Sequence, residues 1–287
     1  MIKILIKKIL AEVAYCCYRI GNNIGVVEPT VRVMSVDETI DELMNSNKSL
    51  VRFGDGELKV IRGGTLEFQE ADKELADELT DLIGYRYDDL MVSVQDIFGN
   101  LDMYVAKSQT FWKDHLLFYR KYYKKLCNPR RVYASTSFSR SYITIADKSQ
   151  SCRWFEKAKR IWKDKDVVIV EGKTTYNGVG NDLLDGCKSV RRIICPSTNA
   201  YGRIDEIRAE CLTMPEDVLF LVTLGPAAKP LVRDLYLAGY RAIDLGQMDS
   251  EYDMFLAGAK EKIATPKPDN LVGIGSKYQK EIVVNVE

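Results

Sequence analysis

Three features of the sequence predict a single α/β domain built on a mostly parallel, doubly wound sheet. Short apolar runs typical of buried strands alternate with amphipathic helical segments. Polar or glycine-rich loops follow these runs, and ligands bind at such positions in doubly wound sheets. The 287-residue chain contains no linker, repeat or low-complexity stretch. We therefore expect residues 35–287 to form this domain, and residues 1–34 to form an N-terminal amphipathic helix and a connector.

The composition argues against several classes of function. The 41 basic residues balance 41 acidic ones, so no overall positive charge favours binding to nucleic acid. Seven cysteines without a Cys-x-x-Cys pair indicate a reducing compartment, and we expect a cytoplasmic protein. The single histidine, His115, argues against serine–histidine hydrolases and histidine metal clusters. Any catalysis should therefore depend on carboxylates.

Residues 2–20 have the pattern of an amphipathic helix with a basic polar side. Charged residues interrupt the segment too often for a transmembrane span, and it lacks the cleavage site of a signal peptide. Two interpretations stay open. The helix lies on the inner face of the plasma membrane or on a partner protein, or else it packs on its own domain. Its apolar residues at helical spacing are Ile2, Leu5, Ile6, Ile9, Leu10, Val13, Cys17 and Ile20.

The remaining elements are predicted in order along the chain. Ser35 and Glu38 have the spacing of a capping box, so a helix should start there and run to about Met44. Pro226 is suited to begin a later helix and Gly239 to end it. Further helices are expected at 73–83, 111–126 and 154–162, and strands at 49–53, 91–94, 132–134, 166–171, 193–195, 218–223 and 241–245. Parallel pairing would bring six loops to one edge of the sheet, namely 54–57, 137–140, 171–182, 196–201, 224–227 and 246–252.

The first of these loops carries two carboxylates. Asp55 and Glu57 lie on either side of Gly56, directly after the strand at 49–53. We expect a tight loop with both carboxylates near its tip, because glycine allows a sharp turn. Two acids at positions i and i+2 can share one hard cation such as Mg²⁺ or Mn²⁺. The alternative is a surface turn with two solvated acids.

Glycine turns and a second acidic pair complete the candidate chemistry. The turn at Gly178 and Gly180 has the first two glycines of the dinucleotide fingerprint but not the third. A helix that begins there would still direct N–H groups at a pyrophosphate. Gly225 opens a second such helix, and a metal beside a pyrophosphate would suit a nucleotide-activated donor. Asp249 and Glu251 repeat the acid-x-acid spacing, so one of them could accept a proton from an acceptor hydroxyl. The alternative is a solvated acid in the first turn of a helix.

Five segments in this order resemble the GT-D family of glycosyltransferases, formerly the domain of unknown function DUF1792. The resemblance runs from about Leu50 to Leu256. It implies a Rossmann-like domain, an Asp-x-Glu metal motif, a UDP-sugar donor, Mn²⁺ or Mg²⁺ as cofactor, and inversion at the anomeric carbon. The segments are Arg52–Glu57, Phe68–Gln69, Gly178–Leu183, Asn199–Tyr201 and Asp249–Tyr252.

The resemblance implies roles for individual residues. Asp55 and Glu57 match the metal and diphosphate motif, and Glu251, or failing it Asp249, matches the catalytic base. Two positions depart from the family pattern: Tyr176 replaces an arginine and Gln247 replaces a histidine. These departures imply a different donor or acceptor, or a weakened enzyme. The residues expected to contact the donor are Arg52, Asp55, Gln69, Gly178, Gly180, Asn181, Asp182, Asn199 and Gly225.

The sequence thus favours a metal-dependent, inverting glycosyltransferase that transfers a hexose from a UDP-sugar to a hydroxyl group. The acceptor would be a bacterial surface glycan, a lipid-linked oligosaccharide or a glycoprotein. Two other classes stay open. One is a metal-dependent phosphohydrolase, which also uses paired acids at strand ends. The other is a non-catalytic nucleotide-sugar-binding scaffold subunit, recruited through residues 1–20; the oligomeric state is open in each case.

Overall fold

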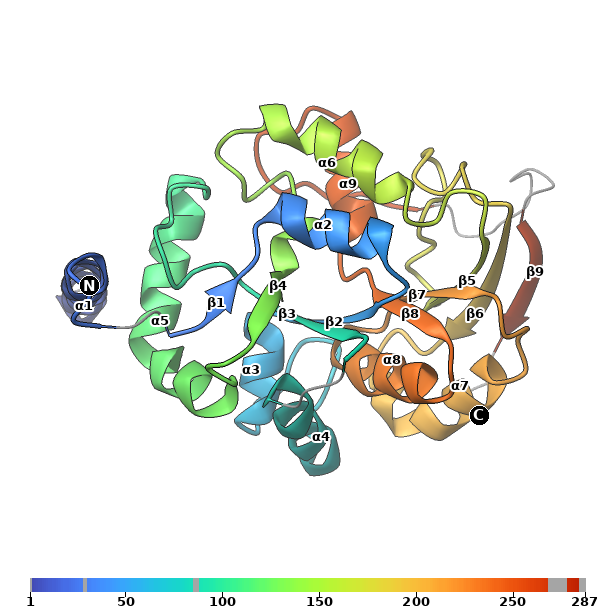
Figure 1. Cartoon of the computed structure of the whole chain (residues 1–287), viewed down its shortest axis with the longest axis horizontal. Coiled ribbons are helices and arrows are strands. Elements are labelled where there is room, and N and C mark those ends of the chain that lie inside the picture. Colours follow the sequence, from blue (N-terminus) through green and yellow to red (C-terminus); the bar gives the residue numbers. More distant parts are fainter. Residues whose placement is uncertain (1, 28–29, 85–87, 268–277, 284–287) are drawn as a thin grey trace.

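In the described part of the chain, nine parallel strands form one sheet at the centre of the computed structural model (Figure 1). The structure describes residues 2–27, 30–84, 88–267 and 278–283. The strands lie in the order β1-β4-β3-β2-β8-β7-β5-β6-β9. They are β1 (Arg32–Val33), β2 (Ser49–Phe53), β3 (Leu90–Val94), β4 (Val132–Ser135), β5 (Asp166–Gly172), β6 (Ser189–Cys195), β7 (Leu219–Thr223), β8 (Arg241–Asp244) and β9 (Tyr278–Val283).

Helices cover both faces of this sheet (Figure 1). One face carries α2 (Val36–Asn45), α6 (Ser149–Lys159) and α9 (Met248–Leu256). The other carries α3 (Asp55–Ile61), α4 (Lys73–Gly84), α7 (Ile204–Cys211) and α8 (Ala228–Leu237). Beyond the β1 edge lie α5 (Ala106–Leu126) and α1 (Ile2–Asn23). Three short 3-10 helices are η1 (Thr136–Ser139), η2 (Ala200–Arg203) and η3 (Gly225–Ala227).

The two halves of the chain meet at β2 and β8 in the middle of the sheet. Leu50 of β2 pairs with Ile243 of β8, and from there β3 and β4 extend one way while β7, β5 and β6 extend the other. Residues 167–170 of β5 are at most 1% exposed, because helices cover both faces. The predicted α/β class and doubly wound parallel sheet are therefore confirmed.

Most predicted elements lie within a few residues of their observed positions. The capping box is present: the Ser35 side chain accepts the N–H of Glu38, and Glu38 Oε2 accepts the N–H of Ser35 at 2.8 Å. For two helices the predicted start, at 111 and at 154, lies five residues after the observed one, since α5 begins at Ala106 and α6 at Ser149. Among the elements that were not predicted, β1 has only two residues, α7 has no side-chain cap, and β9 lies in the C-terminal segment, to which no element was assigned. The helix α9 begins at Met248, inside the loop predicted at 246–252.

Two local predictions are wrong. Residues 55–57 are not a tight loop, because Asp55 begins α3 and Glu57 Oε2 accepts the N–H of Gly54 at 2.7 Å. The glutamate at the third helical position thus supplies the cap that a glycine lacks. No helix follows the Gly178–Gly180 turn either. There Asn181 Oδ1 accepts the N–H of Leu183 at 3.0 Å, a local bond that competes with helix formation.

The N-terminal helix α1 packs on α5 of its own domain. Ala11, Tyr15 and Tyr18 are buried on this side, at 2–8% exposure. Ion pairs flank the contact, with Lys7 at 3.2 Å from Asp114 and Glu12 at 2.8 Å from Lys113. None of the helices in the described residues has the length and apolarity required to cross a membrane.

Candidate active site

A cavity of ≈ 530 Å³ opens at the carboxyl ends of β2, β5, β7 and β8. Each of the six loops that the sequence predicted at this edge contributes at least one lining residue. The convergence of these loops is therefore confirmed. Representative lining residues, one from each loop in chain order, are Asp55, Arg140, Thr174, Ser197, Gly225 and Gln247.

The two carboxylates of the first motif differ in their surroundings. Asp55 lines the cavity, and its carboxylate forms no hydrogen bond or ion pair with any described residue. Both oxygens of Glu57 are bonded, Oε2 to the N–H of Gly54 and Oε1 to Lys229 Nζ at 2.7 Å. Burial opposes ionisation of Glu57, but Lys229 and Arg52 outweigh it and hold its pKa below the usual range. Glu57 is therefore an ionised carboxylate that the protein itself neutralises.

Lys229 of α8 connects the two halves of the site. Its side chain is 1% exposed, and Nζ lies 2.7 Å from Glu57 Oε1 and 3.0 Å from Asp244 Oδ2. Nζ also donates to the carbonyl of Gly225 at 2.9 Å. This buried ammonium thus fixes the start of α3, the end of β8 and the η3 turn relative to one another.

Arg52, at the end of β2, lies beside this cluster and lines the cavity. Burial lowers the pKa of its guanidinium, while Asp244 and Glu57 act in the opposite direction. A Cβ on Gly246 would lie 2.8 Å from Arg52 Nη1, and Gly246 has φ +55°. A side chain at position 246 would therefore displace Arg52.

Several buried polar atoms around the cavity lack a hydrogen-bond partner in the described structure. They lie at the carboxyl ends of β2, β3 and β4, or in the turns that follow. Buried polar groups are nearly always satisfied, so such a concentration indicates a polar ligand or ordered water. The atoms are Arg52 Nε, Gln95 Oε1, Thr136 Oγ1, Arg140 Nε and Ser141 Oγ.

Asn199 positions the segment that carries Phe68 and Gln69. Its N–H donates to the carbonyl of Phe68 at 2.9 Å, and its Oδ1 accepts the N–H of Glu70 at 2.8 Å. Phe68 and Gln69 line the cavity, whereas Asn199 does not. The Phe68 ring, 45% exposed, lies against Gly225, where a Cβ would approach it to 2.6 Å. Asn199 therefore acts through Phe68 and Gln69.

Asp249 holds the glycine turn rather than facing the cavity. Its Oδ1 accepts the N–H of Gly178 and a side-chain N–H of Asn181, both at 2.8 Å, and Oδ2 lies 2.8 Å from Lys267 Nζ. Burial raises the pKa of Asp249 and Lys267 opposes this. The predicted donor residues of this turn do not line the cavity; they are Gly178, Gly180, Asn181 and Asp182.

Glu251 is also bonded within the protein and is 1% exposed. Its Oε2 accepts the N–H groups of Tyr142 at 3.2 Å and Ile143 at 2.8 Å. Its Oε1 lies 3.7 Å from Arg140 Nε. Glu251 thus holds the segment that presents Arg140 to the cavity, and this geometry does not favour direct contact with an acceptor.

Sequence reasoning did not single out Asp96, which follows β3. The last β2–β3 pair is Phe53 with Val94, so Asp55 and Asp96 each come two residues beyond it. Burial raises the pKa of the Asp96 carboxyl to about 6, and the carboxylate makes no hydrogen bond with a described residue. Burial and, to a smaller degree, Asp96 raise the pKa of Tyr104, which Arg140 partly offsets. Asp96 is therefore a second unbonded carboxylate at this edge.

The donor set can be tested against the expected divalent cation. Carboxylate oxygens suit Mg²⁺ and Mn²⁺, and Asp55 offers an unbonded one at the cavity. Glu57 offers none in this conformation, because Lys229 and Gly54 occupy both oxygens. No group of three or more His, Cys, Asp or Glu side chains in the described ranges is arranged to hold a metal. Asp55 therefore fits a cation shared with a ligand's own oxygens.

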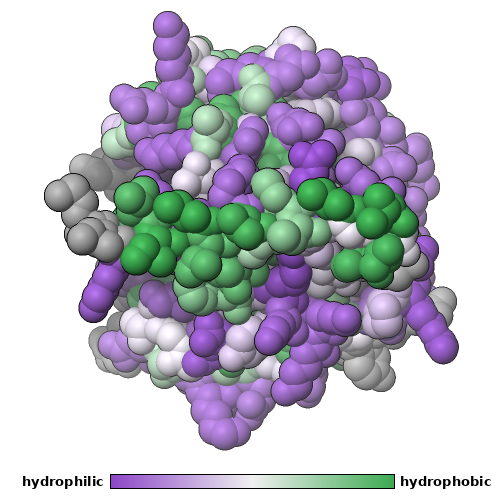
Figure 2. Space-filling view, turned by 90° about the vertical axis from the view of Figure 1, so that its left-hand side faces the viewer, coloured by the Kyte–Doolittle hydropathy of each residue, from purple (hydrophilic) through white to green (hydrophobic). Residues whose placement is uncertain are grey.

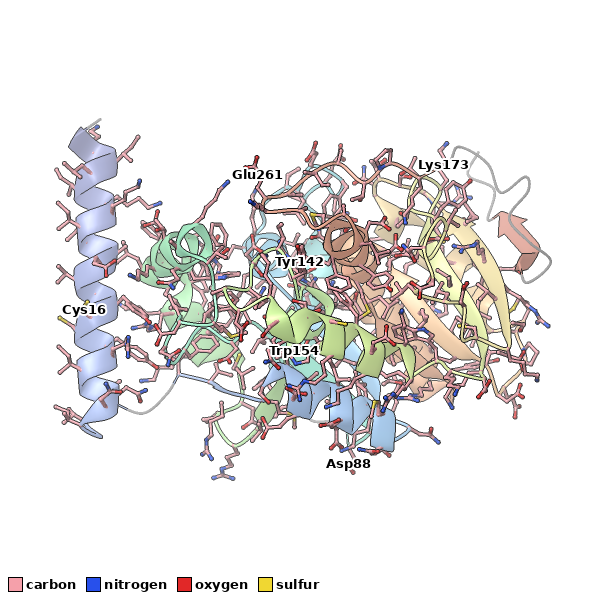
Figure 3. All side chains as sticks on the ribbon, turned by 90° about the horizontal axis from the view of Figure 1, so that it is seen from above. Cys16, Asp88, Tyr142, Trp154, Lys173 and Glu261 are labelled. Atoms are coloured by element: carbon pink, nitrogen blue, oxygen red, sulfur yellow. The ribbon has the colours of Figure 1, made fainter. Side chains whose placement is uncertain are left out.

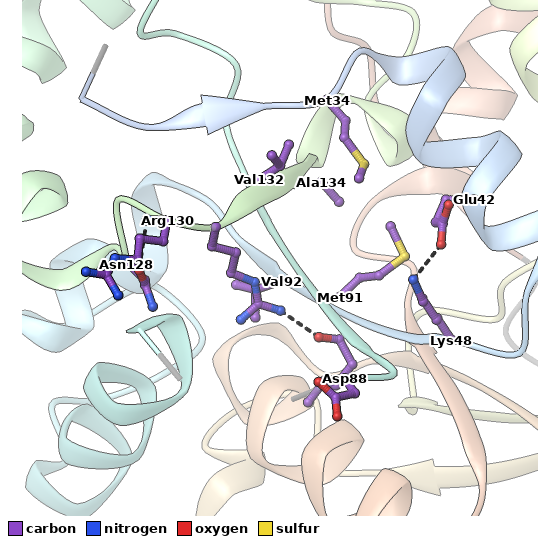
Figure 4. A pocket seen from close by; sticks show the side chains of 12 residues that line it. Met34, Glu42, Lys48, Asp88, Met91, Val92, Asn128, Arg130, Val132 and Ala134 are labelled. Atoms are coloured by element: carbon purple, nitrogen blue, oxygen red, sulfur yellow. Dashed lines mark hydrogen bonds and ion pairs between the residues drawn. The ribbon is translucent and has the colours of Figure 1, made fainter. Parts of the chain in front are cut away.

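A second cavity, of ≈ 270 Å³, lies at the opposite edge of the sheet, at the amino ends of β2, β3 and β4 (Figure 4). Lys48 pairs there with Glu42 at 2.6 Å, and Arg131 donates to the carbonyl of Leu90 at 2.7 Å. None of the predicted site residues lines it. The candidate site is therefore the cavity at the carboxyl edge.

The sheet is that of a Rossmann-like α/β protein, and its polar cavity lies at the carboxyl ends of the strands, where ligands bind in folds of this class. Residues 50–270 match the family model described as the glycosyltransferase GT-D fold. The chain belongs to this GT-D family, formerly DUF1792.

Relatives of known name are similar over most of this chain. Over 84% of the length of this chain, it is 43% identical to a probable glycosyl transferase Gly of Streptococcus gordonii. Over 81% of the length of this chain, it is 42% identical to glycosyltransferase GlyD of Streptococcus pneumoniae. The chain spans only 36% and 29% of those two proteins.

Solved structures agree with the fold. A structure described as a new glycosyltransferase (DUF1792) from Streptococcus sanguinis superposes with a TM-score of 0.83 at 38% identity, covering 88% of this chain and 99% of that one. A second, described as DUF1792 with a distinct glycosyltransferase fold, gives 0.82 at 37% identity, covering 88% and 96%.

Proposed function

We propose that this chain is a metal-dependent, inverting glycosyltransferase that transfers a hexose from a UDP-sugar to a hydroxyl group. The acceptor would be a bacterial surface glycan, a lipid-linked oligosaccharide or a glycoprotein. The observation that supports the proposal most is the unbonded Asp55 carboxylate in a cavity whose walls also carry Arg52, Arg140 and Lys262. Carboxylate and guanidinium groups together suit a diphosphate bound with a cation.

The cavity walls suggest how the donor is held. Arg52 and Arg140 each have a buried Nε without a hydrogen-bond partner, so a diphosphate oxygen could accept a hydrogen bond from each of them. Phe68 offers an aromatic face at the same wall, suited to a base or sugar ring. Thr174 and Ser197 add hydroxyl groups for hydrogen bonds.

A bound Mn²⁺ or Mg²⁺ would offset the charge that develops on the departing diphosphate. Asp55 would hold it directly. Glu57 would hold Asp55 in place through the cap of α3 and its pair with Lys229, and would itself become a ligand only if that pair opens. Substitution of Glu57 would therefore reduce activity less than substitution of Asp55.

For the acceptor proton we propose Asp96 alongside the sequence candidates Glu251 and Asp249. Asp96 lies at the end of the strand next to Asp55 and has no hydrogen-bonded partner among the described residues. A base must reach the hydroxyl proton within hydrogen-bond distance. None of the three carboxylates lines the cavity, but those of Glu251 and Asp249 are bonded to backbone N–H groups and therefore suit positioning roles better.

The proposal can be tested by thermal shift with UDP, GDP, CDP and UDP-sugars, each with Mn²⁺ and with a chelator. A ligand at a hundredfold excess over its dissociation constant stabilises by about 2.7 kcal/mol. UDP-sugars should stabilise the protein only with metal, and Asp55→Asn should remove this effect, while Asp217→Asn at an exposed position should not. Absence of any nucleotide response would refute the donor assignment. Binding without transfer to any acceptor would instead indicate a scaffold subunit.

A further inference from the structure

The apolar side of α1 faces outward, away from the domain that the helix packs on. The helix buries Ala11, Tyr15 and Tyr18 against α5, whereas its large aliphatic residues are half or more exposed. They form a continuous hydrophobic band across this face of the molecule, with hydrophilic residues on both sides (Figure 2). The exposed fractions are Leu5 59%, Ile6 50%, Ile9 54%, Leu10 55%, Val13 54% and Ile20 62%.

Specific contacts fix the helix in this orientation. The Tyr18 hydroxyl accepts the N–H of Thr30 at 2.9 Å, and Lys113 Nζ lies 2.8 Å from Glu12. Cys16 points away from the domain (Figure 3). A surface helix of a globular protein normally turns its apolar stripe toward the core. Here the stripe is held outward, so its exposure is a feature of the packed structure.

The charges of α1 that are not in ion pairs have one sign. The single acid of α1, Glu12, is paired with Lys113, and Lys7 is paired with Asp114. Lys3, Lys8 and Arg19 form no ion pair with an acidic side chain in the described part of the chain. The band is therefore bordered by unpaired positive charge, which is complementary to an anionic surface.

We propose that α1 lies in the interface of a bilayer that contains anionic lipids. Its aliphatic band would enter the acyl region, and Lys3, Lys8 and Arg19 would lie among the headgroups. The 22-residue helix is about 33 Å long, so the contact would run along the membrane plane. A second copy of the chain fits less well, because pairing two such bands would bring like charges together without a free acid on α1.

The test is co-sedimentation of the full chain with vesicles of phosphatidylcholine alone or of equimolar phosphatidylcholine and phosphatidylglycerol. The protein should pellet with the anionic vesicles only, and high salt should weaken binding. Ile9→Glu/Val13→Glu should reduce the bound fraction at least about tenfold. Leu237→Glu/Leu256→Glu is the matched control, since these residues are 63% and 54% exposed on other helices. It should bind like the wild type.

A charge-reversal variant tests the contribution of the lysines, and a mass measurement tests the alternative of a dimer. Lys3→Glu/Lys8→Glu should lose binding to anionic vesicles while keeping the wild-type melting temperature, because both side chains are exposed. Equal binding to neutral vesicles, or no binding to either kind, would overturn the proposal. So would a stable dimer in light scattering that Ile9→Glu/Val13→Glu dissociates. None of these readouts depends on sugar transfer, so they stand or fall independently of the enzyme assignment.

Discussion

Lys229→Met would test whether one buried ammonium holds the site together. Methionine keeps the length and apolar stem of the side chain but removes the charge that lies 2.7 Å from Glu57 and 3.0 Å from Asp244. Breaking a buried ion pair by removing one partner costs about 3–5 kcal/mol. We expect the upper part of this range near neutral pH, because the substitution leaves two carboxylates unpaired at 8% and 1% side-chain exposure.

The loss should depend on pH in a defined direction. The pKa of Glu57 lies below its usual value in the folded wild type, so its stabilisation is complete above the pKa of the unfolded chain and is lost as pH falls through the folded value. Removal of Lys229 takes away the strongest influence that opposes burial, so the pKa of Glu57 should shift upward from its wild-type value. The deficit of the variant should therefore be largest near neutral pH and shrink on acidification, since protonation removes the unpaired charge.

Urea denaturation at several pH values measures this deficit directly. Lys73→Met is the matched control, because Lys73 pairs with Asp77 at 88% and 66% exposure and solvent screens such a pair, so the substitution should change stability little. Adding Glu57→Gln to Lys229→Met should restore part of the lost stability. A deficit below about 1 kcal/mol at neutral pH, or one that does not change with pH, would refute the reasoning.

Three further predictions concern other residues. Burial lowers the pKa of His115 to about 4, so the free energy of unfolding should fall by up to about 3 kcal/mol as pH drops from the ordinary histidine value toward 4; His115→Gln should remove this slope in urea titrations. Asp96→Asn should stabilise the protein in mildly alkaline buffer by up to about 3 kcal/mol, because a desolvated charge is removed. The variant should also transfer sugar more slowly, and the wild-type rate should rise with pH through about 6. Unchanged turnover of the variant would exclude Asp96 as the base. Asn199→Ala should raise the KM for the donor more than it lowers kcat, since Asn199 positions Phe68; equal effects on both would contradict that role.

The sheet could be predicted from the sequence because its signals are local. Each of the seven predicted strands is a short apolar run followed by a polar loop, and parallel topology brings such loops together without knowledge of any single contact. All six loops do line the cavity. The resemblance to the GT-D family supplied a predicted role for the motif at Asp55 and Glu57, and family membership itself is confirmed.

The partners of the carboxylates could not be predicted in the same way. Whether Glu57 faces a metal or Lys229 depends on how α8 packs against β2, over 170 residues along the chain. One signal was present: Lys229 is the only charged residue in the otherwise apolar stretch 224–232, and a buried lysine requires a buried acid. Glu251 and Asp249 bond to backbone N–H groups, which leave no mark in the sequence.

The seam between β2 and β8 has a consequence for how the protein is made. β2 emerges early from the ribosome, but its neighbour β8 follows only after β3 to β7 have been synthesised. Until β8 inserts, the edges of β2 and β7 stay open to pairing with other chains. The same insertion delivers Asp244 to Lys229 and closes the cavity. A nascent or interrupted chain that lacks β8 would therefore also lack the complete cavity at the carboxyl edge of the sheet.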